Sequence, residues 1–413
     1  MERFAAFQHR NFRRYFAGQV ISSVGTWLQA LAVTWLVLDL TGRSDRLGFA
    51  VALQFLPLLL LGAPAGVLAD RVDNRRLLMV TSVVSAALAL AFGLVVSTGS
   101  ADLGVIYGLT FMSGLVLAVE RPAMQALLYQ LVGREALPSA VATNSTVVSV
   151  SRLVGPALGG AMVAVTGVAS CFYANAVSFV VVFVALASIR RSDLVPRPVS
   201  SRTGGNLRAA VVYVRQRPEV RRPLIVMAVV GLVALNFQVT FPSMVRFGFD
   251  RGAGAVGTVM SVSAIGSILG GLYAAGITPN PRRTLALVLA GFGAMLVVFA
   301  AAPNYTVFVV LSIPLGFASA CFQSINTVSV QQATEPAMQG RVMALHQMAW
   351  FGSTPIGAVA MGWVIQSISP RAPFVFGGMA ALGCAVALML SARRDSLADR
   401  ISTVGAASAT VDA

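Results

Sequence analysis

The sequence contains apolar runs long enough to cross a membrane, and this feature limits the fold more than any other. Two of them, Leu47 to Val67 and Leu77 to Val96, flank a short charged turn. At a rise of ~1.5 Å per residue, a helix of about 20 residues crosses a hydrocarbon layer of ~30 Å. Only 11% of the 413 residues are charged, whereas soluble domains average about 25%. The sequence therefore predicts an all-α membrane protein with many transmembrane helices.

Twelve apolar segments can be counted along the chain. They cover residues 15–38, 47–69, 77–98, 103–128, 139–166, 171–189, 223–245, 254–277, 284–302, 306–330, 342–367 and 373–392. We expect residues 1–189 to form an N-terminal six-helix bundle and residues 223–392 to form a C-terminal one. A basic cytoplasmic linker, 190–222, joins them, and a disordered cytoplasmic tail, 393–413, follows. The first segment lacks a small-residue cleavage site, so we expect a retained helix and not a signal peptide.

The basic residues predict the orientation. All 30 are Arg, which indicates a bacterial genome rich in GC, since Arg codons then replace Lys codons. The N-terminus, the even-numbered links and the tail carry 23 of them, against five on the odd-numbered links. Because basic loops stay in the cytoplasm, both termini should be cytoplasmic, in a plasma or inner membrane. This bias accounts for the net charge of +15 without a nucleic-acid partner.

The charged turn between the second and third segments has the sequence GVLADRVDNRR, residues 66–76. Five of the seven residues from Asp70 to Arg76 are charged, so the turn should face water. Its pattern resembles the signature loop of the major facilitator superfamily of secondary transporters, GxLADRxxxRR. The matching residues are Gly66, Asp70, Arg71, Arg75 and Arg76. The chain departs from the family at Asp73, where Gly is usual, and at Asn74, where a basic residue is common.

This resemblance implies a fold of twelve transmembrane helices in two parallel six-helix bundles, with the substrate path between them near mid-membrane. The second half of the chain echoes the first. Gly66-Val-Leu-Ala-Asp before two Arg corresponds to Gly270-Gly-Leu-Tyr-Ala before Arg282 and Arg283, and Gly155-Pro156 corresponds to Thr354-Pro355.

The resemblance also implies a conformational latch in the charged turn. In the family, the loop Asp docks at the positive N-terminus of the eleventh helix and holds the cytoplasmic side closed. In this sequence Asp70 would dock beside Gly340 and Arg341. Arg75 and Glu120 would be its relay partners.

Other stretches resemble one branch of the superfamily. Residues 22–42 and 121–145 are similar to the enterobactin-exporter-like branch of drug and siderophore efflux proteins, the transmembrane secretion effectors. The fifth segment carries a GPxxGG element associated with exporters. Its glycines permit close approach of a neighbouring helix, and its proline bends the helix. These hinge and packing residues are Gly155, Pro156, Gly159 and Gly160.

Polar residues inside the spans are candidates for a substrate cavity. Ser22, Thr26 and Gln29 recur at i, i+4 and i+7 in the first segment, which gives one polar helix face. This face either lines the cavity or forms hydrogen bonds between helices. Further cavity candidates are Asn144, Asn175, Asn236, Gln323, Asn326 and Trp350. A mostly apolar cavity with amides and aromatic rings suits bulky amphipathic ligands.

Ionisable residues inside spans are candidates for proton coupling. They are Glu120, Arg121, Arg152 and His346. Glu120 is the acid expected at real depth, so it is the first choice for proton exchange, although an ion pair with Arg75, Arg121 or Arg152 would explain it equally well. His346 either titrates near neutral pH or is simply hydrogen-bonded.

These features favour a proton-driven exporter of small hydrophobic or amphipathic compounds, such as drugs or siderophore-like metabolites, acting by alternating access. An importer or facilitator, or a non-transporting membrane protein, is the alternative. Without Lys the chain has no P-loop, and with two His it has no HExxH zinc motif, so we expect no enzyme, cofactor or metal. The three Cys lie in separate apolar segments and indicate no metal site. Expected partners are the substrate, protons and lipid, with the chain a monomer.

Overall fold

The computed structural model describes residues 5–196, 207–277 and 281–409, and these residues form helices and no strands. The elements are η1 (Ala5–Gln8), α1 (Arg10–Thr41), α2 (Ser44–Arg71), α3 (Asn74–Ser97), α4 (Leu103–Thr166), α5 (Val168–Ala187), η2 (Arg191–Asp193), α6 (Leu207–Gln216), α7 (Pro218–Val233), α8 (Phe237–Ser243), η3 (Met244–Gly248), α9 (Ala253–Ala275), α10 (Pro281–Ala300), α11 (Tyr305–Ala333), α12 (Gln339–Ser367) and α13 (Ala372–Ala409). Within the described ranges, 11 helical stretches are long and apolar enough to cross a membrane. The prediction of an all-α protein with many spans is confirmed.

The longest of these, α4, consists of two helices that meet at Gly133. A straight helix of 64 residues would measure about 96 Å, three times the hydrocarbon thickness. Gly133 has φ 69° and ψ −174°, a conformation that only glycine adopts readily. We expected a link of ten residues here, and that expectation is wrong. Leu131, Val132 and Ala136 are buried on both sides of the glycine, so the helices continue until they meet.

The seventh segment is interrupted, whereas we expected one helix over 223–245. It begins earlier, at Pro218, and breaks between α7 and α8. At the break, the Asn236 amide donates to the Leu232 carbonyl over 2.8 Å and more weakly to the Gly231 carbonyl. A side chain therefore replaces the backbone donors that the break removes, as a non-helical turn in a membrane requires.

The linker and the tail also differ from expectation. The expected linker contains the short helix α6, and its residues 197–206 lie outside the described residues. The tail, expected to be disordered from residue 393, continues α13 as helix to Ala409, and 410–413 lie outside the described residues.

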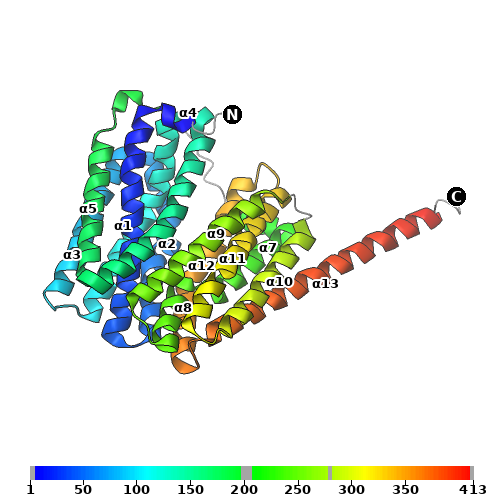
Figure 1. Cartoon of the computed structure of the whole chain (residues 1–413). Helices are drawn as coiled ribbons and strands as arrows, with labels where there is room; N and C mark the ends of the chain where they lie inside the picture. The colour runs from blue at the N-terminus through cyan, green and yellow to red at the C-terminus, as the bar shows by residue number, and fades with distance from the viewer. Residues whose placement is uncertain (1–4, 197–206, 278–280, 410–413) are drawn as a thin grey trace.

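The helices form two bundles, α1–α5 and α7–α13 (Figure 1). A cluster of aromatic rings lies in the core of the second bundle, where Phe299 lies 4.1 Å from Phe308 and 5.1 Å from Phe374 between ring centroids. Two helix pairs, α2–α12 and α4–α9, join the bundles. The bundles come together at the lower end of the view and diverge at the upper end, toward which the N-terminus and the end of α13 both lie (Figure 1).

Candidate functional site

The α4–α9 contact closes the space between the bundles at one end. Gly160 packs on the α9 backbone so closely that a Cβ added to it would lie 2.9 Å from the Ala253 carbonyl oxygen and 3.3 Å from the Gly257 Cα. The Ser261 hydroxyl donates to the Leu153 carbonyl over 2.5 Å. This bond ties α9 directly to the α4 backbone one turn before Pro156.

The α2–α12 contact closes the same end on the other side. Ser44 donates its backbone N–H to the Gln366 side chain over 3.1 Å, and its hydroxyl bonds the Ser243 hydroxyl of α8 over 2.9 Å. Gly362 leaves no room for a Cβ, which would lie 2.6 Å from the Ser44 carbonyl oxygen. Ser44 and Ala253 both follow odd-numbered links, so the two contacts lie at the end of the molecule opposite the charged turn.

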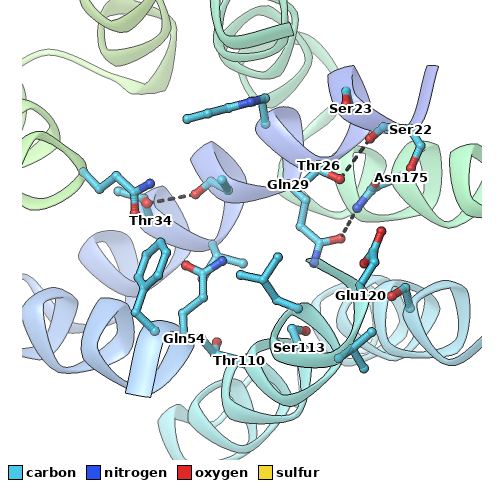
Figure 2. A pocket seen from close by; sticks show the side chains of 18 of the residues that line it. Ser22, Ser23, Thr26, Gln29, Thr34, Gln54, Thr110, Ser113, Glu120 and Asn175 are labelled. Carbon is cyan, nitrogen blue, oxygen red and sulfur yellow. Dashed lines mark hydrogen bonds between the residues drawn. The ribbon is translucent and has the colours of Figure 1, made fainter. Parts of the chain in front are cut away.

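A first cavity of ≈ 310 Å³ lies beside these contacts, mainly within the first bundle. Ser22, Thr26 and Gln29 all line it, on one face of α1 (Figure 2). Gln29 accepts a hydrogen bond of 2.7 Å from the Asn175 amide of α5. Thr26 instead donates to the Ser22 carbonyl in its own helix. The α1 stripe therefore both faces the cavity and ties α1 to α5.

Glu120 (Figure 2) and Arg121 also line the first cavity, and both belong to the first half of α4. Both are half-buried. The Arg121 guanidinium lies 4.6 Å from the centroid of the Phe351 ring on α12. Within the described residues no Arg nitrogen lies within the 4.0 Å of an ion pair with Glu120. Glu120 is the acid among the residues that line this cavity.

A second cavity of ≈ 460 Å³ lies between α4, α9, α11 and α12, and so touches both bundles. Arg152, Gln323 and Trp350 line it, three residues proposed from the sequence. The Arg152 guanidinium lies 5.8 Å from the centroid of the Trp27 ring, which belongs to the first cavity. Gln323 donates to Ser319 in its own helix over 3.0 Å.

His346 and Asn326 form a buried chain within the second bundle. His346 Nε2 lies 2.9 Å from Asn326 Oδ1, and Asn326 Nδ2 donates to the Pro223 carbonyl over 3.0 Å. The Pro223 carbonyl oxygen can only accept a hydrogen bond, so the Asn326 side-chain NH₂ must face it and the Asn326 Oδ1 must face His346. Because Oδ1 can only accept, His346 Nε2 carries the proton of that bond. His346 and Asn326 are absent from the walls of both cavities. This chain joins α12 to α11 and α7.

The remaining candidates serve packing or lie elsewhere. Asn236 caps the break before α8, and Asn144 lies half-buried on α4 outside both cavity walls. Gly155 and Gly159 face α1: a Cβ on Gly155 would lie 2.5 Å from Trp27 Cβ, and one on Gly159 would lie 3.3 Å from Leu28 Cα. The exporter-like element therefore packs α4 against α1 on one face and, through Gly160, against α9 on the other.

The charged turn is anchored to its own bundle. Arg75 is buried and donates from Nε to the Leu186 carbonyl and from its terminal nitrogen to the Ala187 carbonyl, both over 2.7 Å. Asp73 caps α3 by accepting from the Arg76 N–H over 3.1 Å. Gly66 lies half-buried within α2, whereas Asp70, Arg71 and Arg76 are exposed.

Sequence reasoning missed several polar residues in the cavity walls. The first wall also contains Ser23, Thr34, Gln54, Thr110 and Ser113, and the second contains Ser149, Ser267, Ser324 and Thr327. Gln54 was detectable as the amide that interrupts an apolar run. Most of the hydroxyls bond a carbonyl one turn earlier, as Thr110 bonds Ile106 and Ser113 bonds Leu109. A Ser or Thr that bonds its own helix in this way is acceptable anywhere in a membrane helix, so its presence in the sequence does not indicate whether it faces a cavity.

Comparison with known proteins supports a transport fold. A family profile described as transmembrane secretion effector matches residues 1–407. The staphyloferrin A transporter of Staphylococcus aureus (strain NCTC 8325 / PS 47) is 25% identical over 359 residues, which cover 84% of this chain and 87% of that protein. Macrolide efflux protein A of Streptococcus pyogenes is 22% identical over 375 residues, which cover 89% of this chain and 92% of that protein.

A solved structure, that of a D-xylose–proton symporter, superposes with a TM-score of 0.74 over 91% of this chain and 97% of that one, at 10% identity. At this identity the likeness concerns the fold alone. The family match covers almost the whole chain, and it assigns transport and not enzymatic catalysis to the protein. The chain belongs to the transmembrane secretion effector family of the major facilitator superfamily.

Proposed function

We propose that this chain is a proton-coupled exporter of small amphipathic compounds, acting by alternating access in a bacterial inner membrane. The observation that carries the proposal is a mainly apolar cavity with several polar side chains, beside two helix contacts that close the space between the bundles at one end only. The macrolide efflux relative supports export, and the staphyloferrin A transporter supports transport of a small organic compound. A cavity of ≈ 310 Å³ is within the range of sites for drug-sized ligands.

The proposed topology has twelve spans with both termini in the cytoplasm. The two helices of α4 then count separately, because each is long enough to cross the hydrocarbon layer. The excess of Arg on the N-terminus and even-numbered links supports this orientation. In that frame the glycine contacts close the outer side and the bundles diverge toward the cytoplasm, so the molecule is in an inward-facing state.

Glu120 is the proposed proton site. It is half-buried in the wall of the first cavity and lacks an ion-pair partner among the described residues. A carboxyl without a fixed cation can exchange a proton when the cavity opens to water. The buried His346, which contacts Asn326, is a structural residue in this proposal.

The test is dye accumulation in a bacterial host that lacks its own major efflux pumps. Cells that express the chain should retain less of an amphipathic fluorescent dye than cells with an empty vector, and a protonophore should abolish the difference. Glu120→Gln should abolish it too, whereas Glu135→Gln, an exposed acid on the same helix α4, should not. Higher retention on expression, removed by the protonophore, would instead establish import, the alternative that the D-xylose–proton symporter fold permits.

A further inference from the structure

Two arginine side chains lie in the cavity walls without an acidic partner. Arg121 lines the first cavity and Arg152 the second, and both are half-buried. Within the described residues neither guanidinium has a carboxylate within the 4.0 Å of an ion pair, and neither donates a hydrogen bond. Each instead contacts an aromatic ring, Phe351 at 4.6 Å and Trp27 at 5.8 Å from the ring centroids.

A ring contact leaves the donors of a guanidinium unused. The five N–H donors of Arg match the geometry of a carboxylate, which they bind with two parallel hydrogen bonds. The ring attracts the positive charge but accepts none of these donors conventionally. A charged group at membrane depth is retained where it faces a polar path and meets a partner there. The missing partner of these two residues is therefore an anion that visits the cavities.

The two residues are unequal in this respect. Arg121 follows Glu120 in the chain, so an acidic side chain shares the wall of the first cavity with Arg121, although the two form no ion pair. No acidic residue lines the second cavity, so the charge of Arg152 has no counterpart there. Trp350 lines the same cavity and offers a flat apolar surface, stacked on Phe351 with centroids 5.2 Å apart.

The rings connect the two cavities. The Trp27 ring belongs to the wall of the first cavity and contacts the guanidinium of Arg152, which lines the second cavity. The Phe351 ring contacts the guanidinium of Arg121, which lines the first cavity, and stacks on Trp350, which lines the second cavity. An occupant that contacts both cavities therefore meets two cations and a row of aromatic faces.

We propose that the transported compounds are amphipathic organic anions, and that Arg152 binds their carboxylate in the second cavity while Trp27 and Trp350 contact their apolar part. This inference rests on the proposed transport function and names its substrate class. It requires the chain to discriminate by charge: an anion gains the Arg152 interaction, whereas a cation of the same shape is repelled by it.

The test is equilibrium binding to the full-length purified chain in detergent, with two xanthene dyes of opposite charge. Fluorescence anisotropy should give saturable binding of carboxyfluorescein, and rhodamine 6G should bind at least about tenfold more weakly. Arg152→Gln should weaken carboxyfluorescein binding about tenfold or more and leave rhodamine 6G unchanged or tighter. Arg152→Lys, which keeps the charge, should lose less affinity than Arg152→Gln.

Arg246→Gln is the matched control. Arg246 also lies over a tryptophan, 5.6 Å from the Trp35 ring centroid, but lines neither cavity, so its loss should leave both affinities unchanged. Equal binding of the two dyes by the wild-type chain would overturn the proposal, and so would unchanged carboxyfluorescein binding by Arg152→Gln. The dye comparison needs no variant, so a folding defect cannot obscure it. Binding in detergent needs neither a gradient nor a direction, so its failure is distinguishable from a failure of export.

Discussion

The arginine side chains of this protein lie in three different kinds of environment, which the residue type alone does not distinguish. Arg75 is buried against carbonyl groups, Arg152 lies over a ring in a cavity wall, and Arg76 is exposed beside Asp73. The motif match grouped Arg75 with Arg76 because the pattern is local. The environment of Arg75 depends on the C-terminal end of α5, where Leu186 lies 111 residues further along the chain, and no local pattern contains that information.

Replacing Arg75 by Gln should destabilise the protein. The change removes charged donors from the Leu186 and Ala187 carbonyls at the C-terminal end of α5, where a cation is also favoured by the helix dipole. We expect a loss of about 2–3 kcal/mol, the range for hydrogen bonds to charged groups. The free energy of unfolding in detergent measures it. The control Arg76→Gln, at an exposed site, should change stability by less than about 0.5 kcal/mol.

His346 should tolerate replacement by Gln. Its Nε2 donates to Asn326 Oδ1 over 2.9 Å, and a Gln amide can supply a similar donor. We expect His346→Gln to keep the pH profile of transport. His346→Leu should cost about 1–3 kcal/mol of stability, since it leaves a buried acceptor without a donor. A shifted pH profile for the Gln variant, measured as dye efflux against external pH, would give His346 the coupling role instead.

At the scale of elements, hydropathy predicted where spans lie but not where they bend. The span-length runs correspond to helices in the structure, and the α1 stripe of Ser22, Thr26 and Gln29 faces the cavity because helical spacing alone places those residues together. The break before α8 escaped prediction, whereas the turn at Gly133 falls within the link expected between residues 128 and 139, and only its length was wrong. A single asparagine inside an apolar run does not reveal a turn.

The α4–α9 contact should fail when its glycines acquire side chains. A Cβ on Gly257 would lie 3.2 Å from the Gly160 Cα and closer still to the Pro156 carbonyl oxygen, so Gly257→Leu should force the two helices apart. We expect faster labelling of a Ser22→Cys probe by a membrane-impermeant maleimide added outside. The control is Gly271→Leu on the same helix, where a Cβ would meet nothing within 4 Å. Equal labelling rates for both variants would contradict the role of this contact.

For the whole molecule, the α2–α12 pairing gives the latch hypothesis a geometric basis. The helices run antiparallel: Ser44 lies beside Gly362, and a Cβ on Gly352 would lie 2.8 Å from Leu59. If this register continued along both helices in a state where their cytoplasmic ends meet, it would place Asp70 level with Gly340 and Arg341. The family resemblance predicted the same pairing from the motif alone. The divergence of the bundles at that end (Figure 1) could not be foreseen, since one sequence serves every state of a transport cycle.

Asp70→Asn should stop transport and leave folding intact. A neutral side chain lacks the charge attraction to the positive N-terminus of α12, so the cytoplasmic side should no longer be held closed. Dye efflux should fall to the empty-vector level while the melting temperature changes by no more than about 2 °C. Asp73→Asn is the control, because asparagine also caps helices well and keeps the bond from the Arg76 N–H. Normal efflux by Asp70→Asn would rule out the latch.

The closure at the end opposite the charged turn contains few polar contacts. Among the described residues, three hydrogen bonds reinforce it, two made by Ser44 and one by Ser261, and at ~0.5–1.5 kcal/mol each they amount to about 1.5–4.5 kcal/mol. One proton that moves down a potential of ~150 mV releases about 3.5 kcal/mol, at ~2.3 kcal/mol per 100 mV. Glycine has no side chain, so no side-chain rotamers change when the glycine-lined surfaces of two helices separate. In the proposed proton-coupled cycle, the free energy from one proton is therefore comparable with that of these three hydrogen bonds.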